Sequence, residues 1–164
     1  MESHSPIREG TVAGIIGAMS VALWFLIVDS IAGRPFFTPA VLGASLFDLL
    51  GAGFGGRGLF THVAAYTVIH FAAFIAIGIL AASIMNVLDR KPSWIVGFVG
   101  LFIVVELCVF AAVGVLSRSP LFGAIAWYQL GAANLLAAFF MGRYLWRAHH
   151  PVFEERWVRA LDSR

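Results

Sequence analysis

The chain has 164 residues, of which 60% are hydrophobic and 12% charged, and its formal net charge is +2. Soluble domains average about 45–50% apolar and about 25% charged residues, so this composition indicates a protein whose surroundings are largely lipid. It argues against a disordered chain, and one lysine among 11 basic residues leaves no basic stripe that could follow a nucleic acid. The single cysteine, Cys108, excludes an intrachain disulfide framework and any two-cysteine redox or zinc motif.

The first apolar run lies between Glu9 and Asp29 and contains no formal charge. A hydrocarbon core of about 30 Å needs about 20 apolar residues, so this run predicts a transmembrane helix over residues 10–32. A cleaved signal peptide is the alternative, because Arg8 precedes the run and Ser30-Ile31-Ala32 loosely fits a cleavage site. The run is longer than the roughly 7 to 15 apolar residues of a signal peptide, and we therefore predict a retained helix.

The segment that follows, residues 33–60, is too apolar to be a simply solvated loop. We expect it to lie on the interface at the outer side of the membrane that the chain spans, or to dip into that membrane. Thr38 followed by Pro39 is typical of a helix start, with the threonine as N-cap and the proline at the first helical position. The sequence thus predicts a short interfacial or re-entrant helix from Pro39 to about Leu50.

Three more apolar runs predict transmembrane helices over residues 61–87, 93–117 and 121–145. The third span is interrupted only by Glu106. None of the runs alternates in polarity as the strands of a membrane barrel do. The predicted fold is therefore a single all-α membrane domain, a bundle of four transmembrane helices.

The basic residues predict the orientation of this bundle. Eight lie on the side of the two termini and the second connection, and three lie on the other side, at Arg34, Arg57 and Arg118. We expect the bundle to lie in the inner membrane of the cell. The positive-inside rule then predicts that both termini are cytoplasmic. The tail, residues 146–164, predicts an amphipathic helix with a solvated tail as the alternative; its apolar positions are Val152, Phe153, Trp157 and Leu161.

Polar residues at depth are the best guide to function, because ionisable groups are costly in hydrocarbon. At 1.5 Å per residue, His70, Glu106 and Asn134 lie about 12, 15 and 17 Å below the outer surface, on three different helices. One hypothesis is that they form a buried site for a proton, an ion or a small solute. The alternative is that they make interhelical hydrogen bonds in a passive bundle. The entrance of such a site would be lined by Asp29, Arg34, His62 and Tyr66.

A surface of small residues on the first span, Gly10, Gly14 and Gly17, lets another helix approach closely. That helix could belong to this chain, to a second copy or to another membrane subunit. We predict a structural or accessory, partner-binding role first and solute binding or transport second. An enzyme is a weaker hypothesis, because His62 and His70 share one helix and cannot hold a haem between facing helices. No cofactor and no metal site are predicted.

Three runs resemble a group of small bacterial membrane proteins for which no activity is known. They are WFLIVDSIAGRPFFTPAVLG from Trp24 to Gly43, HFAAF from His70 to Phe74, and NLLAAFFMGRYLWR from Asn134 to Arg147. The resemblance covers most of the chain and implies a helical protein of a bacterial inner membrane. It implies no ligand and no catalytic residue.

Overall fold

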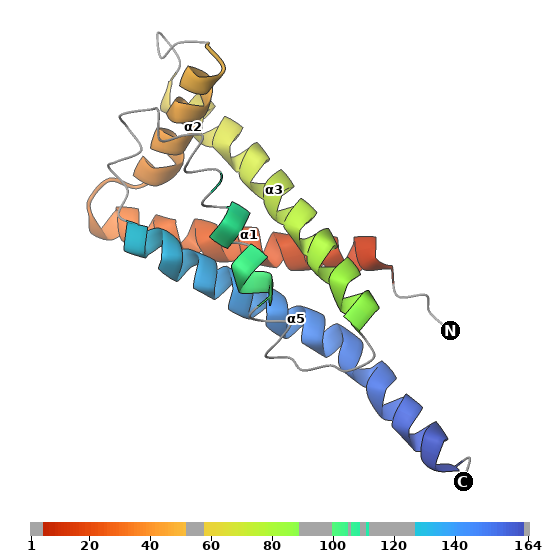
Figure 1. The fold of residues 1–164 in the computed structure, drawn as a ribbon. Helices are drawn as coiled ribbons and strands as arrows, with labels where there is room; N and C mark the ends of the chain where they lie inside the picture. The colour runs from red at the N-terminus through yellow and green to blue at the C-terminus, as the bar shows by residue number, and fades with distance from the viewer. Residues whose placement is uncertain are drawn as a thin grey trace.

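A computed structural model of the chain describes residues 5–51, 58–88, 100–104, 106–108, 111 and 127–162. Within these stretches, the side chains of residues 86–88, 127 and 149–162 are left out of the description. All regular structure in these stretches is helical, as the sequence predicts. The helices are α1 (Pro6–Ile31), α2 (Phe37–Leu49), α3 (Leu59–Leu88) and α5 (Trp127–Asp162), and residues 100–104 and 106–108 are helical as well (Figure 1).

Two helices have the length and composition needed to cross a membrane: α1 and the part of α3 from Leu59 to Met85. Helix α1 begins at Pro6, four residues before the predicted span, because proline suits the first helical position and Glu9 complements the positive end of the helix dipole. Most of the predicted span over 93–117 and the start of the span over 121–145 lie outside the described residues.

Helices α1 and α3 cross with their backbones in contact, at glycines from both helices. A Cβ atom added to Gly14 would overlap the backbone of Phe74 and Ile75, and one added to Gly78 would overlap Gly10 and Gly14. Only glycine lets the two helices come this close. Figure 1 shows the consequence: α3 crosses α1 near the start of α1 and diverges from it toward α2.

Helix α5 packs against another part of α1 through small side chains. Gly17 makes room for Met141, whose sulfur a Cβ atom at this position would meet. Ala13 and Ala18 of α1 and Ala137 of α5 are fully buried. All three glycines of the predicted packing surface are therefore used within the chain, against α3 and α5.

Helix α2 starts two residues earlier than the sequence predicts. It runs from Phe37 to Leu49, and the N-cap is Phe36 in a left-handed conformation (φ 68°), so the predicted N-cap role of Thr38 is wrong. Thr38 lies inside the first turn, where its N–H has no partner within the helix and is bound by a side chain of α1, as described below. The helix packs on the first half of α3, where Gly43 contacts the backbone of His62.

The predicted fourth span and tail are one continuous helix in the structure. The backbone of α5 stays helical through Pro151 to Asp162. A proline inside a helix removes one backbone hydrogen bond and favours a kink, but it does not have to end the helix. The predicted boundary between span and tail at residues 145 and 146 is therefore not a helix end.

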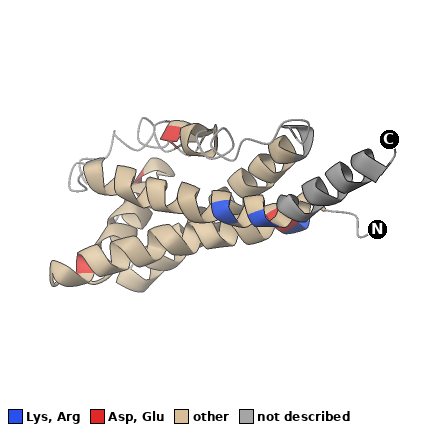
Figure 2. Cartoon of the chain, turned by 90° about the horizontal axis from the view of Figure 1, so that it is seen from below, with Lys and Arg blue, Asp and Glu red and all other residues tan. Residues whose placement is uncertain are grey.

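Charged residues are sparse along the bundle. In Figure 2 the basic residues in view lie toward the end at which α1 begins, and long stretches of α1 and α3 carry no charge. Large apolar side chains face outward along the same stretches, such as Leu23 (51% exposed), Ile27 (57%) and Val68 (69%). The described helices thus expose large apolar residues along stretches that carry no charge.

Candidate functional site

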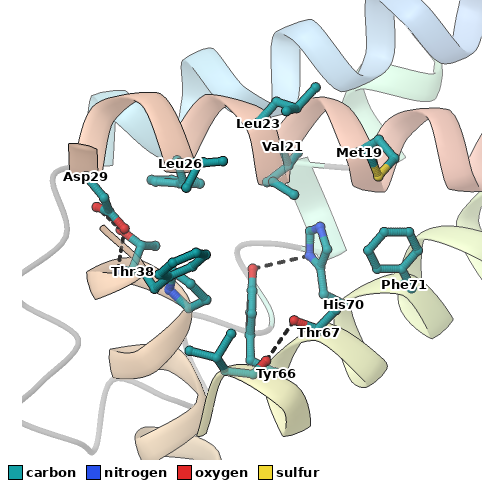
Figure 3. A pocket seen from close by; sticks show the side chains of 15 residues that line it. Met19, Val21, Leu23, Leu26, Asp29, Thr38, Tyr66, Thr67, His70 and Phe71 are labelled. Atoms are coloured by element: carbon teal, nitrogen blue, oxygen red, sulfur yellow. Dashed lines mark hydrogen bonds between the residues drawn. The ribbon is translucent and has the colours of Figure 1, made fainter. Parts of the chain in front are cut away.

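A cavity of about 250 Å³ lies where α1 and α3 diverge, next to the first turn of α2 (Figure 3). Most of its wall is apolar, contributed by α1 residues from Met19 to Leu26 and by α3 residues such as Val63 and Phe71. Its polar lining residues are few: Asp29, Thr38, Tyr66, Thr67 and His70. A concave, mostly apolar space with a few converging polar groups is the usual form of a small-molecule site.

His70 lies at one end of this cavity and links α3 to α1. Its Nε2 atom lies 3.2 Å from the backbone carbonyl oxygen of Ala18, and only 8% of the residue is exposed. Because a carbonyl oxygen can only accept, Nε2 must carry the hydrogen of this bond. The Tyr66 hydroxyl lies 3.2 Å from Nδ1, and in the neutral imidazole it donates to that nitrogen. Both ring nitrogens are therefore satisfied inside the protein.

Tyr66 takes part because residues four apart share one face of a helix. Its ring stacks on His70 with centroids 5.2 Å apart, and the Phe74 ring lies 4.8 Å away on the same helix. Thr67, the next polar residue along the cavity wall, donates its hydroxyl hydrogen to the Val63 carbonyl oxygen at 2.7 Å. The hydroxyl oxygens of Tyr66 and Thr67 can each still accept a hydrogen bond.

Asp29 lies at the other end of the cavity from His70, in the last turn of α1 (Figure 3). Its carboxylate accepts two hydrogen bonds from Thr38, one from the backbone N–H at 2.7 Å and one from the hydroxyl at 2.9 Å. The first N–H groups of a helix have no partner within the helix, and the helix dipole favours an anion there. Asp29 thus caps α2 from the preceding helix, and only 4% of the residue is exposed.

Two of the four residues predicted to line the entrance line the cavity. Asp29 and Tyr66 line the cavity, but Arg34 and His62 are not among its lining residues. The Arg34 guanidinium lies 4.1 Å from the centre of the Phe37 ring, and the Asp29 carboxylate is hydrogen-bonded to Thr38.

His62 faces α2 rather than the cavity. Its ring lies 5.6 Å from that of Phe47, and its backbone packs against Gly43. His62, Tyr66 and His70 are spaced four residues apart, so helical periodicity places all three on one face of α3. That periodicity could not show that α2 would cover the first turns of α3.

Two of the three residues predicted to share a buried site do meet. The Asn134 side-chain amide donates a hydrogen bond to the Glu106 carboxylate at 3.3 Å, and Asn134 is 3% exposed. His70 does not join this pair, because its ring is turned to Ala18 and Tyr66. Equal depth was the basis of the prediction, and depth does not determine which neighbour a helix face meets. Helix α3 packs mainly on α1 and α2, whereas α5 packs mainly on α1.

Sequence reasoning missed the contribution of Thr38 to the site, because the threonine was assigned to capping its own helix. The usable signal was Asp29, a carboxylate a short connection before the Thr-Pro helix start. Among the described residues, no group of three His, Cys, Asp or Glu side chains is arranged to hold a metal ion. The side chains of His149 and His150 lie outside that description.

In the described stretches the chain is thus an all-helical protein with two helices long and apolar enough to span a membrane. It matches no protein family model, no curated protein and no solved structure. The resemblance to small bacterial membrane proteins stays a prediction.

Proposed function

We propose that this chain is a four-span bacterial inner-membrane protein that binds a small, mostly apolar molecule in the cavity between α1, α2 and α3. The observation that carries the proposal is the cavity itself: about 250 Å³, an apolar wall, and polar groups at its two ends. Such a space gives an apolar ligand burial and gives its polar atoms a few fixed partners. Transport of the bound molecule is a further step that this site would serve.

The membrane location is supported by α1 and α3, which are apolar along a length sufficient for the hydrocarbon core. The third and fourth spans of the proposal rest on the apolar runs over 93–117 and 121–145. The cytoplasmic position of both termini rests on the distribution of arginines. With this orientation, Asp29 and α2 lie at the outer surface, and the cavity opens near the outer leaflet.

A partner-binding role has less support than the sequence alone indicated. Its main basis was the surface formed by Gly10, Gly14 and Gly17, and that surface is buried against α3 and α5 of the same chain. The Glu106–Asn134 hydrogen bond is the kind of contact that fixes helix packing in a membrane protein. We therefore assign these two residues to packing and restrict the proposed site to the cavity.

The test is native mass spectrometry of the protein extracted gently from its own membranes, with an absorption spectrum of the same sample. We expect a retained small mass in the wild type. Ala22 lines the cavity and is not buried against a neighbouring helix, so Ala22→Phe should fill the space and release that mass. Ala73→Phe is the matched control, because Ala73 is exposed on α3 and does not line the cavity. A bare wild-type protein, or equal retention in both variants, would contradict the proposal.

The orientation has its own test in a Cys108→Ser background, which removes the single cysteine. Ser30 and Ser5 are exposed residues at the two ends of α1. A membrane-impermeant maleimide should label Ser30→Cys in intact cells and Ser5→Cys only after lysis. Labelling in the reverse order would place the cavity on the cytoplasmic side.

A further inference from the structure

The cavity combines aromatic rings from three parts of the chain with a single formal charge. Phe25 of α1, Phe36 before α2, and Tyr66 and Phe71 of α3 all contribute to its wall. Asp29 is the one charged residue among the described residues that line it. Aromatic faces carry negative electrostatic potential, and they attract cations within about 6 Å of the ring centre.

The Asp29 carboxylate keeps capacity for a ligand although Thr38 binds it. An ionised carboxylate offers about four acceptor positions, and Thr38 occupies two of them. In the apolar cavity its charge acts through a low effective dielectric, which strengthens its attraction for a cation compared with water. Arg34, the nearest basic residue along the chain, is exposed and stacked on Phe37 outside the lining. The one formal charge on the described cavity wall is therefore negative, and the Thr38 donors and the N-terminal end of the α2 dipole offset it in part.

We propose that the ligand of this cavity is an organic cation, an amine or quaternary ammonium compound with an apolar body. The inference rests on the proposed function, and it adds the charge of the ligand. The apolar body would lie against the α1 and α3 side chains, and the cationic group would lie between the Phe36 ring and the Asp29 carboxylate. A neutral molecule of the same size would gain the first contact and lose the second.

The test compares benzyltrimethylammonium with N-benzylacetamide, a neutral compound of similar size, by titration calorimetry of the full chain in a nonionic detergent at low salt. We expect the cation to bind about tenfold more tightly, the difference that a carboxylate and an aromatic face add to equal apolar contact. Asp29→Asn should abolish this difference, because asparagine can still accept from the Thr38 N–H but carries no charge. Asp48→Asn, a change of an exposed aspartate on α2, should preserve it.

Phe36→Leu gives an independent variant in case Asp29→Asn disturbs α2. Phe36 is 47% exposed and caps α2 through its backbone carbonyl and not through its side chain, so leucine should leave the fold intact and weaken binding of the cation alone. Equal affinities of the two compounds, both lost in Ala22→Phe, would overturn the cationic assignment and leave the proposed function standing. Cation binding that survives Ala22→Phe, or binding of neither compound, would also overturn the assignment, and the retained-mass experiment then decides the proposed function separately.

Discussion

The two halves of the α1–α3 pair differ in the separation of the two helices. In the first half of α1, Gly10 and Gly14 meet Gly78 and the backbones touch, so there is no space between the helices. In the second half the helices diverge, and the cavity between them is lined by the first turn of α2 and by side chains that include His70 and Tyr66. The same two helices therefore form a rigid crossing at one end and a cavity at the other.

The difference lies in what determines the separation of the helices. At the crossing the determinant is the absence of side chains, which lets the two backbones pack directly against each other. At the cavity the determinants are polar contacts: His70 with Ala18, and Asp29 with Thr38. Changes at the crossing should act on stability, whereas changes at the cavity should act on stability less and on binding more.

The largest effect is expected at the crossing. Gly78→Ala adds a Cβ atom into the backbone of α1 and should lower the free energy of unfolding by about 2–3 kcal/mol, the cost of overpacking a tight interface. Gly131→Ala is the matched control, because a Cβ atom there meets nothing within 4 Å. It should instead raise stability by about 0.5–1 kcal/mol through helix propensity. Unfolding by added denaturing detergent measures both, and changes of the same sign would contradict the packing argument.

Next comes the cap of α2. Asp29→Ala leaves the Thr38 N–H without a partner and should destabilise the protein by about 2 kcal/mol, in the range for a hydrogen bond to a charged group. Asp29→Asn should recover part of this loss. Asp48→Ala, at an exposed position, should stay within about 0.5 kcal/mol of the wild type. If the two alanine variants unfold alike, Asp29 does not act as a cap.

A smaller effect is expected at the end of the cavity where Tyr66 and His70 lie. Tyr66→Phe removes the hydroxyl that donates to His70 Nδ1 and should cost about 1 kcal/mol. A double-mutant cycle with His70→Leu isolates the pair, and the coupling energy should account for most of that cost. A coupling near zero would mean that the two side chains are merely adjacent.

The smallest effect is expected for Glu106 and Asn134. Hydrogen bonds between membrane helices average about 0.6 kcal/mol, so the cycle of Glu106→Ala and Asn134→Ala should give a coupling of that size. Ligand retention by the Glu106→Gln protein should equal that of the wild type. Loss of the retained mass in this variant would return Glu106 to the binding site and contradict its assignment to packing.

Much of the fold was predictable because its signals are local. The apolar runs that became α1 and α3 have the length that the hydrocarbon core demands, and their ends fall within a few residues of the predicted ones. The small residues on α1 predicted close packing, and glycine has the same effect whichever helix approaches. The partner was not predictable, since α3, α5 and a second chain would all leave the same pattern in the sequence.

The site was predictable only in part, for the same reason. Depth along a helix follows from counting residues, and it brought Glu106 and Asn134 together correctly. It also placed His70 with them, because counting cannot determine which helix faces which. Likewise, Asp29 and Arg34 were both expected to line the entrance, but only Asp29 lines the cavity, and its carboxylate accepts hydrogen bonds from Thr38.

The sequence by itself determined that the described part of this protein is helical and largely apolar, and where α1 and α3 run, because these properties depend on neighbouring residues and on the length of each apolar run. Only the tertiary structure decided that Asp29 caps α2, that the glycines meet Gly78, and that α1 and α3 diverge around a cavity. These contacts join residues far apart in the chain, and they depend on rotations and crossing points of helices that no local pattern records.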